Sequence, residues 1–310
     1  MPAYQTTSPV LFLIFNRPDT TQKVFEQISE AKPAKLYIAA DGPRRDREGE
    51  DLLCKETREI IKNINWPCEL KTLFRDKNLG CKYGVSTALD WFFSNENEGI
   101  ILEDDCLPSN DFFRFCDVLL EKYREDTRIS SIAGCNFHSG KRWGDKSYYF
   151  SNNLEVWGWA SWRRVWQHYD AELSEYQAED VSEAFNTVFN EPIISAEYLE
   201  IFNQLKAGKI DTWDYQLKFI TFFNNGLTII PNVNLISNIG FRADATHTKT
   251  DNDQLADLPT EALSDPLSHP LYIIPNKEAD LNILEFEFQL RQKKINNNKL
   301  SRKFKRWLKD

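Results

Sequence analysis

The chain has 310 residues, of which 41% are hydrophobic and 13% aromatic, and this composition predicts a folded globular protein with one large core or two small ones. The 38 Lys and Arg residues against 47 Asp and Glu residues give a formal net charge of −9 at pH 7. Because neutralisation of phosphates drives general nucleic-acid binding, this balance argues against nucleic acid as a partner.

The six cysteines show no Cys-x-x-Cys pair, so we expect reduced thiols rather than a disulfide framework or a zinc site. No stretch of sequence approaches the roughly 18 apolar residues that a membrane-spanning helix needs. The apolar run at residues 10–15 is too short for a signal peptide and lacks a preceding basic region. The sequence therefore predicts a cytoplasmic protein.

The first third of the chain alternates short apolar runs with segments of helical spacing. The runs predict strands at residues 10–15, 35–40, 69–74 and 100–102, and the segments between them predict helices at 19–30, 50–64 and 83–93. Strands separated by helices in this way form right-handed βαβ units around a parallel sheet.

Polar residues follow each of these strands. In a parallel sheet the carboxyl ends of the strands meet at one edge, where the ligand crevice lies. A polar loop residue is common at any one such position, so the set as a whole favours a site. Its members are Asn16, Arg17, Asp41, Arg75, Asp76, Glu103, Asp104 and Asp105.

The run Glu103-Asp104-Asp105 follows a buried strand directly. Adjacent carboxylates repel, and burying them unpaired costs several kcal/mol each, so a cation is expected to offset their charge. Oxygen ligands suit Mg²⁺ or Mn²⁺. The alternative is a solvated turn that ends the strand before a helix near Asn110.

Residues 141–169 are unusually aromatic. Trp159, Trp162 and Trp166 fall at positions i, i+3 and i+7, which predicts one face of a helix that packs in the core. Trp157 and Gly158 precede this stripe, and we assign that pair to a possible sugar contact.

Further along, Asp211 and Asp214 precede a predicted helix that runs to about Phe223. A carboxylate here suits a general base, and a helix cap is the structural alternative for either residue.

From residue 278 a helix leads into the segment 289–310, which holds nine Lys or Arg residues interspersed with apolar ones. This mixture is typical of a helix that lies on an anionic membrane surface, and a solvated terminal helix is the alternative.

The segment from Arg75 to Phe113, RDKNLGCKYGVSTALDWFF leading into GIILEDDCLPSNDFF, resembles the metal-binding region of GT-A fold glycosyltransferases that use nucleotide sugars. It is most similar to the N-acetylglucosaminyltransferase I family, which shares the Glu-Asp-Asp motif, the proline and the Asp-Phe-Phe helix start, and it also resembles bacterial sugar transferases of that fold. The resemblance is dense over residues 9–120 and thinner afterwards.

This resemblance implies an α/β fold of GT-A type, Rossmann-like, with a mostly parallel central sheet flanked by helices and an abutting acceptor-side α+β half. The expected halves are residues 1–125, which bind the nucleotide sugar, and residues 126–285, which bind the acceptor. Residues 286–310 form the basic amphipathic tail.

The resemblance also implies roles for the acidic residues. Asp105 would ligate Mn²⁺ or Mg²⁺, Asp104 would contact the ribose or a metal-bound water, and Glu103 would hold the turn and contact the nucleotide. Asp41 would accept a hydrogen bond from the uracil imide. Asp214 lies where the resembling enzyme keeps its base, although Trp213 replaces a paired acid, which leaves Asp211 as a rival.

Other positions would complete the donor site by the same resemblance. Phe15, Asn16 and Arg17 would line the base and ribose, while Arg75 and Lys82 are plausible contacts to the diphosphate or base. His247 follows Asn238-Ile239-Gly240-Phe241, where related transferases have a loop that touches the diphosphate, so it would bind nucleotide sugar or metal.

The implied activity is metal-dependent transfer of a sugar from a nucleotide diphosphate sugar, with a UDP-sugar expected, to a hydroxyl of a glycan or glycolipid acceptor with inversion. Bacterial polysaccharide or lipopolysaccharide synthesis is the expected setting. One alternative is a sugar-phosphate nucleotidyltransferase, although those usually carry a Gly-rich basic loop where this chain has Asn16-Arg17-Pro18-Asp19. A non-catalytic nucleotide-sugar-binding or glycan-binding protein is the other.

Overall fold

The computed structural model describes residues 4–189, 191–241 and 255–293. The chain divides into two compact units, one of residues 1–171 with 211–275 and the other of residues 172–210 with 276–310. The halves expected at residues 1–125 and 126–285 are defined by what they bind and stay a prediction.

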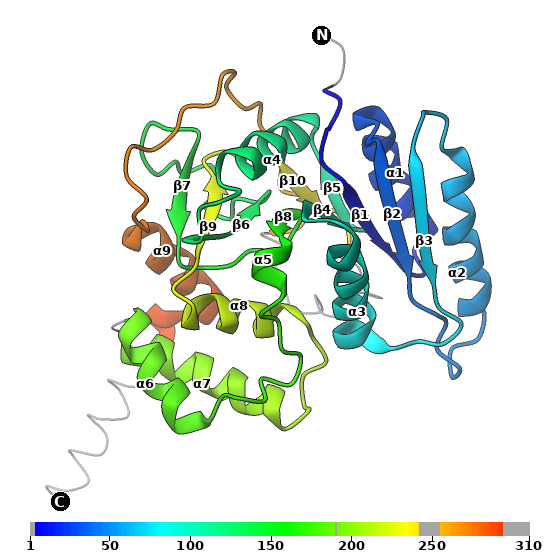
Figure 1. The fold of residues 1–310 in the computed structure, drawn as a ribbon. Coiled ribbons are helices and arrows are strands. Elements are labelled where there is room, and N and C mark those ends of the chain that lie inside the picture. Colours follow the sequence, from blue (N-terminus) through cyan, green and yellow to red (C-terminus); the bar gives the residue numbers. More distant parts are fainter. Residues whose placement is uncertain (1–3, 190, 242–254, 294–310) are drawn as a thin grey trace, which may run out of the picture. The chain divides into compact units, whose positions relative to one another are not determined.

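An eight-stranded sheet forms the centre of the first unit within the described residues (Figure 1). Four of its seven strand pairings are parallel, which confirms the predicted α/β class with a mostly parallel sheet flanked by helices. In spatial order the strands are β3 (Glu69–Phe74), β2 (Lys35–Ala40), β1 (Val10–Ile14), β4 (Glu98–Glu103), β8 (Trp159–Trp162), β6 (Ile129–Ala133), β9 (Leu227–Pro231) and β7 (Tyr148–Ser151).

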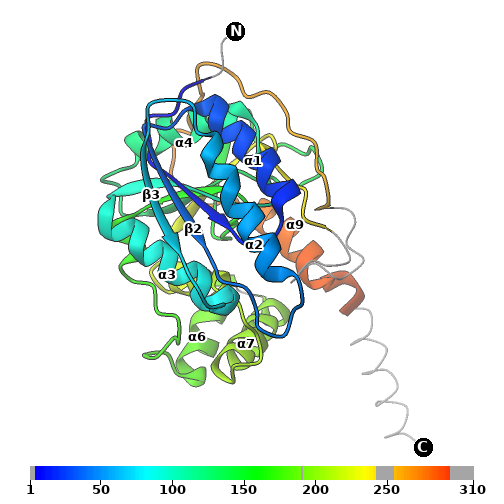
Figure 2. The ribbon, with the colours of Figure 1, turned by 90° about the vertical axis from the view of Figure 1, so that its right-hand side faces the viewer.

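Helices cover both faces of the four parallel strands β1 to β4. On one side lie α1 (Pro18–Ala31), α2 (Glu50–Glu59), a 3₁₀ turn (Ile60–Asn63) and α4 (Asn110–Lys122); on the other lies α3 (Gly80–Asn95) (Figure 2). Successive side chains of β1 point to opposite faces, so Phe12 joins the core under α1 and α4 while Leu11 joins the core under α3. Because both faces are covered, the strand is buried at every position, as its continuous apolar sequence predicts.

The tryptophan-rich segment corrects one prediction. Trp159 and Trp162 lie in strand β8 rather than on a helix, and only residues 163–166 are helical (α5, Arg163–Trp166). Strand β8 pairs antiparallel with β4 and β6, and these long-range pairings outweigh the helical spacing of the tryptophans. As residues three apart on a strand, Trp159 and Trp162 belong to the two different cores.

Three further elements frame the edge of the sheet where the acidic run lies. Strands β5 (Cys106–Pro108) and β10 (Ile236–Asn238) form a small antiparallel pair directly after the acidic run, and α8 (Asp214–Phe223) begins at the proposed base. Where β10 continues, the backbone N–H of Ile239 donates to the carbonyl of Asp105 at 2.9 Å. The chain near residue 240 is therefore fixed beside the acidic run.

The second unit contains α6 (Ala178–Phe189), α7 (Pro192–Lys206) and α9 (Lys277–Phe288). Its core includes Tyr198, whose ring lies 5.6 Å from that of Phe185 and 5.0 Å from that of Phe288 between ring centroids. Leu290, an apolar member of the predicted amphipathic tail, is only 4% exposed, while residues 294–310 of that tail lie outside the described residues. No helix in the described part of the chain is long and apolar enough to cross a membrane.

Candidate functional site

The carboxyl ends of β1, β2 and β4 open onto a cavity of about 380 Å³. Residues at the start of α3 and the segment before and at the start of α8 complete its wall, and all of them belong to the first unit. The predicted site residues that line it are Phe15, Arg17, Asp41, Arg75, Glu103, Asp104, Asp105, Trp157, Asp211 and Asp214.

Arg17 binds two carboxylates of the acidic run at once. Its Nη1 lies 2.9 Å from Oδ2 of Asp105, and its Nη2 bonds to Oδ1 of Asp104. The other oxygen of Asp104 accepts the backbone N–H of Phe15 at 3.3 Å. The turn between β1 and α1 therefore supplies both the cation and the backbone donor that hold these acids.

The acidic run remains short of positive charge. Burial, followed by the neighbouring charges of Asp105 and Asp104, raises the pKa of Glu103 to about 8. Burial also raises the pKa of Asp104 to about 6, even though Arg17 acts in the opposite direction. The negative charge of Asp214 also raises the pKa of Glu103, so Asp214 at the start of α8 lies near enough to the acidic run to interact with it electrostatically. Additional positive charge here would be favourable.

The acidic run could supply one or two ligands to a metal ion whose remaining ligands come from water or substrate. Within the described residues, no group of three or more His, Cys, Asp or Glu side chains is arranged to hold a metal ion. A Mg²⁺ ion in an enzyme is commonly held by one or two carboxylates together with substrate phosphates, which matches the two aspartates of this cavity. Gly240 leaves room beside them, since a Cβ there would lie 2.2 Å from Oδ2 of Asp105.

Asp41 and Arg75 are held by the region around the start of α3. The carboxylate of Asp41 accepts the backbone N–H groups of Leu79 and Gly42 at 2.9 and 3.0 Å. Burial raises its pKa, and these hydrogen bonds oppose that effect. Arg75 donates to the carbonyl of Gly84 at 3.2 Å and to the hydroxyl of Thr87 at 2.7 Å. Both side chains are thus positioned at the wall of the cavity.

Asp211 caps α3, a helix 130 residues earlier in the sequence than its own position. Its two carboxylate oxygens accept the backbone N–H groups of Cys81 and Lys82 at 3.1 and 3.0 Å. Gly80 has a φ of +78°, and a Cβ there would lie 2.7 Å from the Asp211 carboxylate, so glycine permits this approach. The helix cap considered for Asp211 is therefore real, but the helix is α3 rather than the one that follows it.

Asp214 differs from Asp211 in its surroundings. It begins α8, lines the cavity and accepts a hydrogen bond from the hydroxyl of Thr212. Trp213 before it is 2% exposed and stacks on Trp159 at 5.7 Å between ring centroids, so the backbone at the start of α8 is anchored in the core.

The remaining predicted residues lie in other surroundings. Trp157 lines the cavity and contacts Phe137 and Phe241 edge-on, whereas Gly158 packs in the core, where a Cβ would lie 2.4 Å from Ile236. Asn16 donates to Glu50 at 2.9 Å and is not part of the cavity wall, and neither is Lys82, whose backbone N–H donates to Asp211. His247 lies outside the described residues.

Arg44 and Arg58 are two residues that sequence reasoning missed. Arg44 lines the cavity, pairs with Glu50 and lies over the ring of Phe15 with its guanidinium carbon 5.5 Å from the ring centroid. Its place in the loop after the second strand is the signal that would have indicated it, since the residues after parallel strands face the crevice.

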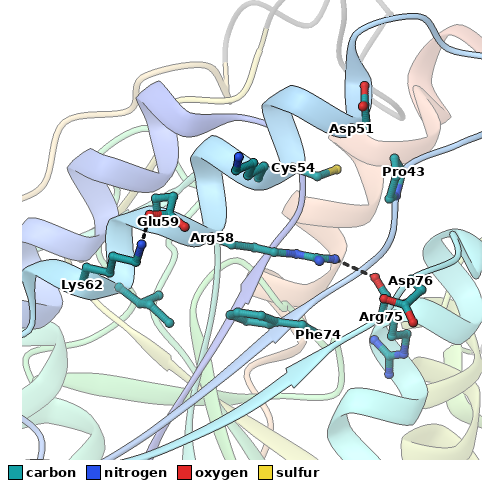
Figure 3. A pocket seen from close by; sticks show the side chains of 11 residues that line it. Pro43, Asp51, Cys54, Arg58, Glu59, Lys62, Phe74, Arg75 and Asp76 are labelled. Atoms are coloured by element: carbon teal, nitrogen blue, oxygen red, sulfur yellow. Dashed lines mark hydrogen bonds and ion pairs between the residues drawn. The ribbon is translucent and has the colours of Figure 1, made fainter.

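Arg58 lies in a second hollow of about 450 Å³ between α2 and β3 (Figure 3). Its side chain reaches from α2 across Phe74 and donates to the backbone carbonyls of Asp41 and Arg75 at 3.0 and 2.7 Å. These carbonyls follow the ends of β2 and β3, so Arg58 joins the two strand ends from outside the cavity. No local sequence pattern predicts such a contact.

No family model matches the sequence, and no curated protein matches it significantly. Among solved structures, the apo form of mouse xyloside xylosyltransferase 1 aligns with 70% of this chain and 81% of its own at 10% identity and a TM-score of 0.35. An apo UDP-glucose pyrophosphorylase aligns with 72% of this chain and 90% of its own at 12% identity and a TM-score of 0.31. The inositol-1-phosphate CTP transferase from T. maritima aligns with 73% and 86% at 9% identity and a TM-score of 0.37. At these values the likenesses assign neither family nor activity, and the fold class rests on the strand order itself.

Proposed function

We propose that this chain is a metal-dependent glycosyltransferase that moves a sugar from a nucleotide diphosphate sugar, a UDP-sugar in the first instance, to a hydroxyl of a glycan or glycolipid. The observation that carries the proposal is one cavity at the carboxyl ends of parallel strands that is lined by Glu103, Asp104, Asp105 and Asp214, with Arg17 bound to Asp104 and Asp105. A sugar transfer of this kind needs both a place for a charged diphosphate and an acid close to it.

The residues at the strand ends would bind the donor. Asp41, whose half-buried carboxylate lies between the end of β2 and the start of α3, would accept a hydrogen bond from the base, and the Phe15–Arg17 turn would line the base and ribose. Asp105 would ligate a Mn²⁺ or Mg²⁺ ion, with Asp104 beside it. A bound cation of this kind neutralises the charge that grows on the departing diphosphate.

Asp214 would act as the general base. An acceptor hydroxyl is a poor nucleophile until its proton is removed during attack, and Asp214 is an acid in the same cavity as the metal-binding run. Direct attack on the anomeric carbon then inverts its configuration. Asp211 is less suited to the role because both of its oxygens already accept backbone hydrogen bonds from the start of α3 and are less available to an acceptor hydroxyl.

A sugar-phosphate nucleotidyltransferase is the second candidate. Arg17 favours it, because such enzymes bear a basic residue after the first strand that holds a triphosphate. The turn at residues 15–18 contains no glycine, whereas their loop is Gly-rich, and this difference supports the glycosyltransferase. The predicted non-catalytic role gives no reason for three carboxylates at a strand end.

Product analysis separates these functions. The protein is incubated with Mn²⁺ and either a panel of UDP, GDP, dTDP and CMP sugars or nucleoside triphosphates with sugar 1-phosphates. A glycosyltransferase releases the free nucleotide from one nucleotide sugar, by transfer or by slow hydrolysis. Release of pyrophosphate from a triphosphate would instead establish the nucleotidyltransferase, and binding without any product would indicate a non-catalytic protein.

A further inference from the structure

Arg17 binds the same two aspartates that the proposed function assigns to the metal ion. The guanidinium bridges Asp104 and Asp105, and the side chains of these two aspartates are only 5% and 17% exposed, so few other groups reach them. Arginine suits this place because its planar fork reaches two carboxylates at once.

The backbone of Arg17 is held at the start of α1, whereas its long side chain can adopt other rotamers. The residue precedes Pro18, the first residue of α1, and its carbonyl accepts the N–H of Thr21 at 3.0 Å. The side chain of Arg17 lines the cavity wall and is 26% exposed. A rotation of the side chain therefore changes the partner of the guanidinium without disturbing the strand or the helix.

A divalent ion on Asp105 and the guanidinium of Arg17 need the same carboxylate oxygens. The divalent ion and the Arg17 guanidinium, both beside the same carboxylates, would also repel each other, because solvent screening inside the cavity is weak. When the ion binds, Arg17 requires another anionic partner, and the one that the proposed substrate brings is its diphosphate.

We propose, on the basis of the proposed function, that Arg17 is an internal counter-ion that competes with the divalent cation for Asp104 and Asp105 and moves to the donor diphosphate when the cation binds. Metal and nucleoside diphosphate therefore bind cooperatively. The coupling is reciprocal, so each ligand tightens the binding of the other by the same factor.

The experiment measures the affinity of the purified full chain for Mn²⁺ alone, from the free-ion signal in electron paramagnetic resonance. In Arg17→Gln the carboxylates lose their competing cation, and we expect Mn²⁺ to bind about tenfold tighter, within the usual range of such couplings. Arg44→Gln is the matched control. It removes the same charge from the same cavity, but Arg44 pairs with Glu50 rather than with the aspartates, so the affinity should stay close to wild type.

Added UDP completes the test. In the wild type, UDP should tighten Mn²⁺ binding strongly while uridine, which has no phosphate, should not; in Arg17→Gln the gain from UDP should be smaller. Arg17→Lys serves if the glutamine variant does not fold, because lysine keeps the charge but lacks the planar fork that donates to both aspartates at once. Its affinity for Mn²⁺ should lie between those of the other two proteins.

Equal Mn²⁺ affinity in the wild type, Arg17→Gln and Arg17→Lys would overturn the competition and leave the proposed function intact. An equal gain in Arg17→Gln and Arg44→Gln would overturn it as well, because the effect would then be one of general charge. If no variant bound Mn²⁺ with or without UDP, the metal-dependent function would fail and the competition with it.

Discussion

Three adjacent carboxylates, of which Asp104 is buried and the other two are partly buried, make the ionisation of Glu103 sensitive to folding. Its pKa is raised to about 8 in the folded protein, mainly by burial and then by Asp105 and Asp104, from an ordinary value of 4.5. Between these values the folded state holds a proton that the unfolded state has lost, so the free energy of unfolding falls as pH rises.

We therefore expect the metal-free protein to lose resistance to urea between about pH 5 and pH 8, and Glu103→Gln to lose much less, because glutamine has no proton to release. Urea midpoints at several pH values measure this effect. Addition of Mn²⁺ should restore part of the stability at the higher pH. Parallel curves for the two proteins would show that Glu103 is not the group responsible.

The two acids near the start of α8 should respond differently to loss of charge. Asp214→Asn keeps the shape of the side chain but cannot accept a proton, so kcat should fall by roughly 10² to 10⁴ with little change in donor affinity. Asp211→Asn weakens the cap of α3 and should lower the free energy of unfolding by about 1 kcal/mol. Steady-state kinetics and urea unfolding on both variants measure this contrast. A large loss of kcat in Asp211→Asn with normal turnover in Asp214→Asn would move the base to Asp211.

The cavity depends on contacts between strand ends and helices. Arg58 on α2 donates to the backbone carbonyls of Asp41 and Arg75, the residues that follow β2 and β3 and that line the cavity. Arg58 does not line the cavity itself and acts through these two residues, so it is a positioning residue.

Arg58→Met should lower the free energy of unfolding by about 1–3 kcal/mol, since hydrogen bonds from charged donors are lost. It should also raise KM for the donor more than it lowers kcat, because Asp41 and Arg75 would be held less firmly. Lys55→Met is a suitable control, as Lys55 lines the same hollow from the same helix. Equal effects of the two variants on KM would count against a specific role for Arg58.

The sequence predicts the parallel core and the place of the acidic run because both depend on local patterns. Buried strands are continuously apolar, and polar residues after them fall at one edge by the geometry of the sheet. The tryptophan strand β8 and the cap formed by Asp211 depend on partners far away in the chain, and Trp159 and Trp162 carry a spacing that local reasoning assigns to a helix. The ion pairs between Arg17 and the two aspartates could not be predicted from the sequence, since a basic residue after a strand does not reveal which carboxylates it will bind.

The net charge of −9 is unevenly distributed along the chain, because residues 289–310 form a basic segment with nine Lys or Arg residues. We propose that the part of this segment after residue 293 lies on an anionic membrane surface at the cytoplasmic face, where a lipid-linked acceptor would be found, since Leu290 is buried. Full-length protein should sediment with anionic liposomes at low salt and a chain ending at residue 293 should not. Equal sedimentation of the two would place the membrane contact elsewhere or remove it.

The proposed function requires the cavity to bind a nucleoside diphosphate sugar through a divalent cation on Asp105. Calorimetric titration of UDP-sugar into the wild type and Asp105→Ala, each with and without Mn²⁺, tests this requirement after circular dichroism has shown that both proteins are folded. We expect binding in the wild type to require Mn²⁺ and the variant to lose the Mn²⁺-dependent part, because removal of one ligand from a site with few protein ligands costs most of the affinity. Equal, Mn²⁺-dependent binding by both proteins would contradict the requirement.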